Sequence, residues 1–482
     1  MSEAAIETPS RERPSGETPS RLARALRGWR GFAILYVVFA GAYLGASGGR
    51  LIQHSMYNHY VYLAEGWLHG RLALEGQPPN ENDWAKVDVF KLKDGRELRG
   101  MYGSKTGGPA DRFYPLRGPS ETVAETDIVA RSSIRYVSFP PFPAVLMAPF
   151  VAIWGLRFND VLFTALWAAL NPALLFMLLR DLQRRGFSER SVGDDLWLTV
   201  MFGVGSVYYY CSVIGQVWFT ALVVGVTVSI GYAWASIDAA RPGLAGLCLA
   251  LGFATRPPWL AVPLFAFEAV RVSGGWPALR TAAGWRALAP RLIRFAVPVA
   301  VVGVALAAYN MARFASPFEF GHRFLNVQWQ ERIARFGLFN YHFLSRNLAA
   351  ALVLLPRILP HAPFVKISQH GMSMLVTSPN LGYTVMPQRR TVLTKPLWLT
   401  VAALAIPSLL YQNSGYIQCG YRFSLDYLVF LVMLLAVGDR RFTRLFKALV
   451  VVAFGINLFL AITFDRYPEF QYDDSFFPHG QN

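Results

Sequence analysis

The chain has 482 residues, of which 54% are hydrophobic and only 16% are charged. A soluble protein of this length carries more charge, and its apolar runs are shorter than about 18 residues. Apolar runs recur here from residue 31 to residue 464. Composition therefore excludes a soluble globular protein and predicts an all-α polytopic membrane protein.

The formal net charge is +16. In a chain this apolar, basic loop residues set the topology and contact anionic membrane lipids, so we expect no nucleic-acid partner. The three cysteines do not form a disulfide framework, and no His/Cys cluster has the spacing of a zinc site. An Asp-x-Asp pair is also lacking, which disfavours a transferase that holds a nucleotide sugar through a metal. We expect neither a metal nor another cofactor.

The N-terminal thirty residues predict a disordered basic tail, and the apolar run 31–48 follows it. This run ends in small residues like a signal-peptide cleavage site, but thirty preceding residues are unusually long for a signal peptide. We therefore expect an uncleaved first helix. Further crossings are expected near 160–180, 195–211, 216–236, 243–255, 258–270, 292–312, 396–411, 423–438 and 446–464, with one more inside 346–386.

Basic clusters orient these crossings, because short cytoplasmic loops are enriched in Lys and Arg. The clusters are Arg21–Arg30, Arg180–Arg190, Arg271–Arg294, Arg389–Lys395 and Arg440–Lys447. They all lie inside if Pro140–Gly155 is a membrane-surface or re-entrant helix. The prediction is a single membrane domain, 31–464, of about eleven crossings with a cytoplasmic N-terminus. Residues 49–158 form a large first outer loop carrying surface helices, and 465–482 form an outer tail.

The outer segments share aromatic and polar motifs. They read Tyr57-Asn58-His59, Leu63-Ala64-Glu65-Gly66-Trp67, Tyr136-Val137-Ser138-Phe139-Pro140-Pro141, Ala254-Thr255-Arg256-Pro257-Pro258, Tyr309-Asn310-Met311-Ala312-Arg313 and Gly420-Tyr421-Arg422-Phe423-Ser424-Leu425-Asp426. In this order and spacing, the chain resembles bacterial GT-C-type membrane glycosyltransferases. That superfamily includes the protein O-mannosyltransferases (family 39) and the lipid A aminoarabinose transferases.

The resemblance implies a transfer of sugar from a polyprenyl-phosphate donor to a glycan, lipid or protein acceptor. It implies an enzyme of the bacterial inner membrane, surrounded by membrane lipids, with its active face on the periplasmic side. The family usually places an acidic residue just after the first helix, as a metal-independent base or to orient the acceptor. Here the matching residues are Met56-Tyr57-Asn58-His59, without a carboxylate.

Three residues are candidates for the base that this departure leaves open. A general base must be titratable and within hydrogen-bond reach of the acceptor. His59 titrates near neutral pH. Glu65 follows Asn58 by two helical turns and lies on the same helical face. Asp83, in Asn82-Asp83-Trp84, lies deeper in the loop.

Two arginines are candidates for binding the donor phosphate. Arg256 ends an apolar segment, and Arg422 begins another, where a charge is costly unless it faces a cavity or an anion. A guanidinium matches a phosphate in a bidentate manner. The alternative for Arg422 is an ion pair with Asp426 at the i,i+4 spacing. Other candidates for a substrate groove are Tyr57, Asn58, Asn310, His322 and Tyr421, with Trp67 and Trp84 as possible platforms for a sugar ring.

Two other functions compete with the glycosyltransferase. A secondary transporter or lipid flippase predicts internal inverted repeats and helices broken by Gly or Pro. Broken helices are present, but no repeat is evident, and the long outer loop stays unexplained by transport. The missing carboxylate near Asn58 keeps open a third alternative, a scaffold that retained the fold without activity.

Overall fold

The computed structural model describes residues 21–103, 112–325, 327 and 329–473. Within them, five helices are long and apolar enough to cross a membrane. They are α2 (Gly28–Ser47), α5 (Asp160–Arg184), α8 (Val217–Ser236), α12 (Ala282–Phe314) and α18 (Arg444–Thr463). Each coincides with a predicted crossing.

The other predicted crossings correspond to shorter helices. These are α6 (Val192–Gly203) with α7 (Tyr208–Cys211), α9 (Pro242–Phe253), α10 (Val262–Val272), α16 (Thr394–Leu410) and α17 (Leu425–Val437). The predicted count of eleven is therefore not confirmed. The crossing expected inside 346–386 is wrong. The longest helix there is α14 (Leu344–Leu352), whose nine residues rise about 14 Å, against a hydrocarbon layer of about 30 Å. Short elements follow it: β6 (Arg357–Ile358), β7 (Val365–Ser368), α15 (Met374–Thr377) and a 3-10 helix (Pro379–Val385).

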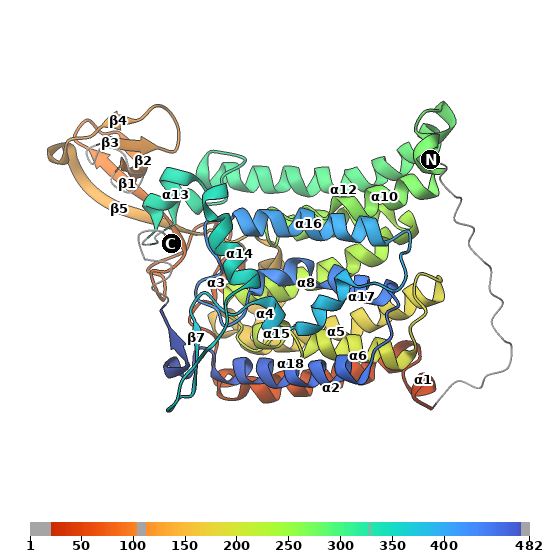
Figure 1. The fold of residues 1–482 in the computed structure, drawn as a ribbon. Coiled ribbons are helices and arrows are strands. Elements are labelled where there is room, and N and C mark those ends of the chain that lie inside the picture. The colour runs from red at the N-terminus through yellow and green to blue at the C-terminus, as the bar shows by residue number, and fades with distance from the viewer. Residues whose placement is uncertain (1–20, 104–111, 326, 328, 474–482) are drawn as a thin grey trace.

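Helices α8 and α17 form the centre of the bundle. Both are apolar on all sides, and nearly all of their residues are buried, as expected for helices surrounded by other helices. Helices α5, α9 and α17 pack on α8, while α2 packs on α5 and α16 on α17. The long helix α12 packs mainly along α9 and leaves most of its apolar surface exposed. Figure 1 shows these helices running side by side in roughly one direction.

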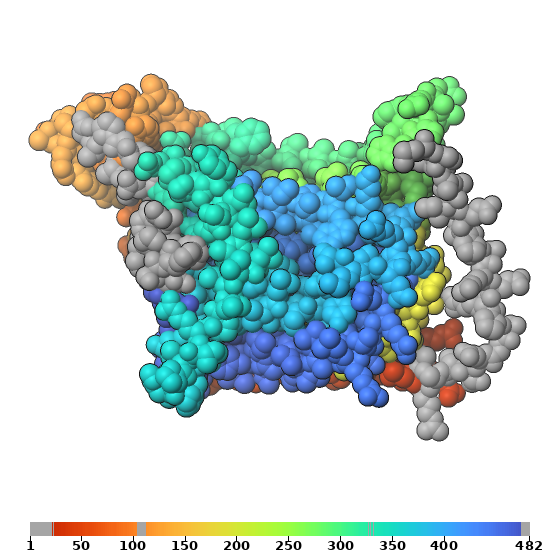
Figure 2. Space-filling view, in the orientation of Figure 1, coloured from red at the N-terminus to blue at the C-terminus, as the bar shows by residue number. Residues whose placement is uncertain are grey.

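The segment predicted as the first outer loop contains an antiparallel sheet, which corrects the all-α prediction. Its strands are β1 (Trp84–Leu92), β2 (Glu97–Tyr102), β3 (Arg112–Pro115), β4 (Glu121–Thr122) and β5 (Ile128–Val137), in the order β4-β3-β2-β1-β5. Strands β1 and β2 pair from Lys91 opposite Glu97 to Asp88 opposite Gly100. Figures 1 and 2 show the sheet protruding at one end of the bundle.

Two helices flank the sheet in sequence. Helix α3 (His59–Leu68) precedes it, and α4 (Phe142–Trp154) follows it and packs on α3. Helix α4 matches the run Pro140–Gly155, and its Phe150, Ile153 and Trp154 side chains are exposed. At the end of the bundle away from the sheet lie α1 (Arg21–Ala25), the α5–α6 connection and the start of α12 (Figure 1).

Candidate functional site

A cavity of about 1040 Å³ lies at the end of the bundle that carries the sheet. Its wall is built by the residues just before β1 and just after β5, the start of α8, the α9–α10 turn, and segments near 318–329, 404–426 and 464–471. Predicted site residues that line it are Tyr57, Asp83, Arg256, His322 and Arg422. Segments far apart in the sequence thus meet at one hollow.

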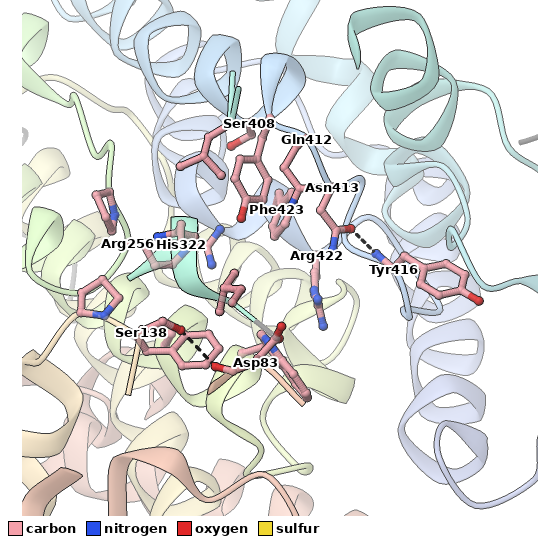
Figure 3. Close-up of a pocket in the computed structure, with 18 of the residues that line it drawn as sticks. Asp83, Ser138, Arg256, His322, Ser408, Gln412, Asn413, Tyr416, Arg422 and Phe423 are labelled. Carbon is pink, nitrogen blue, oxygen red and sulfur yellow. Dashed lines mark hydrogen bonds between the residues drawn. The ribbon is translucent and has the colours of Figure 1, made fainter. Parts of the chain in front are cut away.

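The sheet holds Asp83 at the cavity wall. Trp84, the next residue, is fully buried and pairs with Val137 across β1 and β5. The hydroxyl of Ser138 donates a hydrogen bond to the backbone oxygen of Asp83 at 3.1 Å, as Figure 3 shows. The indole Nε1 of Trp218, at the start of α8, donates to carboxylate Oδ2 at 2.9 Å. Asp83 is therefore fixed from both the sheet and the helical bundle.

The surroundings of Asp83 make it a weaker acid than usual. Burial raises the pKa of its carboxyl to about 6, and the hydrogen bond from Trp218 and the nearby charge of Arg422 offset only part of that rise. A carboxylate with a pKa near the working pH is well suited to accept a proton. Figure 3 shows Arg422 extending toward Asp83.

Arg422 lies in a 3-10 turn (Arg422–Ser424) ahead of α17 and is only 5% exposed. Its guanidinium packs 4.9 Å from the centre of the Phe219 ring. Among the described residues, its Nη1 has one long hydrogen bond, 3.5 Å to the oxygen of Ile417, while its buried Nε has no partner. Burial lowers its pKa, yet an arginine remains protonated at neutral pH. Arg422 thus places at the cavity a cation that has no ion pair within the described part of the chain.

Arg256 has a different environment. Its Nε and Nη2 donate to the two carboxylate oxygens of Asp426 at 2.7 and 3.0 Å. Burial alone would lower the pKa of Arg256, but Asp426 more than offsets this and holds it above the usual value. The predicted alternative of an Arg422–Asp426 pair is wrong, because Asp426 pairs with Arg256. Arg256 lines the cavity with its charge already neutralised.

The other two candidate bases lie outside the cavity wall. His59 is fully buried, stacks on Trp84 with ring centres 4.3 Å apart, and its Nε2 lies 3.1 Å from the backbone oxygen of Asn82. Burial lowers its pKa to about 4, so it is neutral at pH 7. Glu65 accepts two hydrogen bonds of 3.1 Å from Arg71. The contacts with Trp84, Asn82 and Arg71 account for the positions of His59 and Glu65.

Of the residues predicted to line a substrate groove, only some line the cavity. His322 lines the cavity, and burial lowers its pKa to about 4. Asn58 is buried beside His54, with 3.3 Å between Asn58 Nδ2 and His54 Nδ1. Asn310 accepts from Arg313 at 2.9 Å and donates to the Pro317 oxygen at 3.2 Å. Tyr421 is fully buried, and neither it nor Asn58 or Asn310 lines the cavity.

The two tryptophans that were candidates for sugar stacking also face other side chains. Trp84 is covered by His59, and Trp67 packs edge-on against Tyr309 with ring centres 6.1 Å apart. Neither lines the cavity. The aromatic rings that do line it beside Asp83 are Tyr57, Phe139 and Trp218.

Sequence reasoning missed several lining residues. Gln216 and Trp218 lie at the start of α8, and Asp465 belongs to the segment predicted as an outer tail. Only their position in the sequence could have indicated these residues, because each adjoins a predicted crossing on the side that is predicted to carry Asp83. No group of three or more His, Cys, Asp or Glu side chains that could hold a metal occurs in the described ranges.

No family model matches the sequence, and no curated protein matches it. Among solved structures, the chain is similar to the apo form of the Archaeoglobus fulgidus oligosaccharyltransferase, with a TM-score of 0.45 and 11% sequence identity. The alignment covers 90% of this chain and 55% of that one, so the chain spans about half the length of that protein.

Proposed function

We propose that this protein is a membrane glycosyltransferase. It moves a sugar from a polyprenyl-phosphate donor to an acceptor at the outer face of the bacterial inner membrane, with Asp83 as general base and Arg422 as the phosphate-binding residue. The observation that carries the proposal is that these two side chains line one cavity, with Arg422 extending toward Asp83. Asp83 is a carboxylate with a pKa raised to about 6, and Arg422 is a cation without an ion pair among the described residues.

The pair suits a direct displacement at the anomeric carbon. The acceptor oxygen forms a bond to that carbon while its proton passes to the Asp83 carboxylate. The bond between the anomeric carbon and the phosphate oxygen breaks, and its electron pair leaves with the lipid phosphate. Arg422 stabilises the negative charge that develops on this phosphate. In-line attack inverts the configuration at the anomeric carbon.

The walls of the cavity suit a lipid-linked substrate. Phe219, Phe253, Leu404 and Phe464 contribute apolar surface, whereas Asp83, Arg256 and Arg422 provide a small number of fixed polar groups. Ligand sites combine an apolar lining with a few placed polar groups in this manner. A cavity of about 1040 Å³ accommodates a sugar phosphate and the first carbons of its lipid chain.

A turnover assay with the full chain in lipid nanodiscs tests the proposal. Radiolabelled polyprenyl-phosphate hexoses and pentoses are offered with glycan, lipid and peptide acceptors, and the released lipid phosphate is measured. We expect release that depends on an acceptor, and its loss in Asp83→Asn. Glu65→Gln is the matched variant, because Glu65 lies outside the cavity wall.

Three results would count against the proposal. Release that survives in Asp83→Asn but not in Glu65→Gln would transfer the base to Glu65. Donor binding without turnover for every donor and acceptor would favour the inactive scaffold. Movement of intact labelled donor between the two leaflets, without release of lipid phosphate, would favour the flippase.

A further inference from the structure

A second carboxylate, that of Asp465, faces the cavity beside Asp83. It lies immediately after α18, in an exposed position at the cavity wall. Gln216 Nε2 donates a hydrogen bond of 2.8 Å to its Oδ2. Gln216 and Trp218 are two residues apart at the start of α8, so the segment that holds Asp83 also holds Asp465.

An aromatic surface lies between these carboxylates. Burial raises the pKa of the Tyr57 hydroxyl, and the negative charges of Asp465 and Asp83 add to this rise. It packs against Trp218 with ring centres 4.8 Å apart. The backbone oxygen of Tyr57 accepts from the Val217 nitrogen at 3.0 Å, which ties this ring to the start of α8. Tyr57, Trp218 and the two carboxylates thus form one preorganised wall, called here the Tyr57–Trp218 wall.

The cavity also has an unsatisfied hydrogen-bond donor, which is independent of this wall. Arg422 is only 5% exposed, and its Nε lacks a partner among the described residues. Buried polar groups are nearly always hydrogen-bonded, so a guanidinium whose buried Nε is unpaired at a cavity indicates a ligand. In the proposed reaction, Arg422 binds the phosphate of the sugar donor. The Tyr57–Trp218 wall is therefore available for the acceptor.

The arginines near the two carboxylates decide which kind of ligand the Tyr57–Trp218 wall can bind. Arg50 donates to the backbone oxygens of Ala461 and Phe464, and its charge acts on Asp465. The charge of Arg422 acts on Asp83. Each carboxylate is thus partly compensated by an arginine, which disfavours an ammonium ligand and favours neutral hydroxyl donors. A sugar ring offers such hydroxyls at its edge and an apolar face of C–H groups for Tyr57.

We infer that the acceptor is a carbohydrate, held over Tyr57 and Trp218 by two hydroxyl groups. One hydroxyl donates to Asp83 and is the nucleophile, and the other donates to Asp465. Asp465 is then a substrate-binding residue that selects a saccharide over a peptide with a single hydroxyl. This inference rests on the proposed glycosyl transfer for its nucleophile, whereas saccharide binding itself does not require turnover.

Saturation-transfer NMR on the full chain in nanodiscs tests the binding step. The probes are methyl glycosides of mannose, glucose and galactose, with N-acetylthreonine amide as the peptide probe and ethanolamine as the amine probe. We expect saturation transfer to a methyl glycoside but not to the other two. Asp465→Asn keeps the shape and an oxygen for Gln216, and it should weaken binding roughly tenfold, as the loss of a hydrogen bond to a charged group predicts. Glu469→Gln, an exposed change four residues on, is the matched control.

The two hypotheses fail in different ways. Binding of threonine amide or ethanolamine without binding of any glycoside overturns the carbohydrate acceptor and leaves glycosyl transfer standing. Glycoside binding that is equal in wild type and Asp465→Asn overturns the role of Asp465. Glycoside binding that depends on Asp465, in a protein that releases no lipid phosphate, supports the acceptor site and overturns the proposed function. With turnover, Asp465→Asn should raise the acceptor KM roughly tenfold and leave kcat nearly unchanged.

Discussion

Arg256 and Asp426 form a bidentate ion pair between residues 170 positions apart, with N–O distances of 2.7 and 3.0 Å. Arg256 belongs to the turn between α9 and α10, and Asp426 begins α17. The pair therefore joins two walls of the cavity. Because the side chains are only 20% and 10% exposed, removal of one partner would leave the other charge buried and uncompensated.

The first prediction concerns this ion pair. Arg256→Ala should destabilise the protein strongly, by about 3–5 kcal/mol, the range found when one partner of a buried pair is removed. The double variant Arg256→Met with Asp426→Leu should recover much of this loss, since no buried charge remains. Thermal unfolding in nanodiscs, followed by intrinsic tryptophan fluorescence, measures both. Arg422→Ala is the contrasting variant, because it removes a cation that has no ion pair among the described residues, and it should unfold at nearly the wild-type temperature. Equal losses in Arg256→Ala and Arg422→Ala would contradict this role of the pair.

The second prediction concerns the pH dependence of turnover. A base must be deprotonated, so kcat should rise with pH through about 6, the pKa of Asp83. Trp218 donates to the Asp83 carboxylate and stabilises its charged form. Trp218→Phe should therefore raise this pKa and move the acid limb of the profile to higher pH. A limb that stays in place in Trp218→Phe would show that another group titrates.

Part of this arrangement follows from sequence. Hydropathy places the five long helices because spans of about 20 apolar residues dominate their own local signal. The sheet was missed although Lys86-Val87-Asp88-Val89 alternates as a half-buried strand does, and Asp94-Gly95 marks a hairpin turn. The strongly apolar flanks drew the interpretation toward surface helices.

The sequence predicts several residues of the site, but it does not predict which residues they contact. Arg256 and Arg422 were candidates because a charge beside an apolar span is costly. Asp83 was a candidate because it is a titratable carboxylate in the predicted outer loop. Their partners come from distant segments, as Asp426 does for Arg256 and Trp218 for Asp83, and helical spacing cannot predict such contacts. Glu65 followed from the helical face of Asn58, yet neither residue lines the cavity.

The third prediction concerns the thermal stability of the protein, which the ionised Asp83 carboxylate should reduce at neutral pH. Its folded-state pKa, about 6, lies above the ordinary value of 3.8. A raised carboxyl pKa contributes stability below the unfolded-state pKa, and this contribution is lost as pH rises through the folded-state pKa. Asn does not titrate. Asp83→Asn should therefore gain thermal stability over wild type between pH 4 and pH 7, while losing turnover. A constant difference across that range would contradict the buried, titrating carboxylate.

The last prediction concerns Gly215, which precedes the residue that holds Asp465. Its φ of +78° is a conformation that side chains disfavour, and a Cβ atom there would lie 2.4 Å from the Cα of Val161 on α5. Gly215→Ala should therefore push the start of α8 away from α5, at a cost of about 1–3 kcal/mol. The displacement would move Gln216 and Trp218 together, so the acceptor KM should rise along with the loss of thermal stability. Gly41→Ala on α2 is the matched control, since a Cβ there meets nothing within 4 Å and should leave both quantities unchanged. Loss of stability in Gly215→Ala without any change in KM would separate the helix start from the acceptor wall.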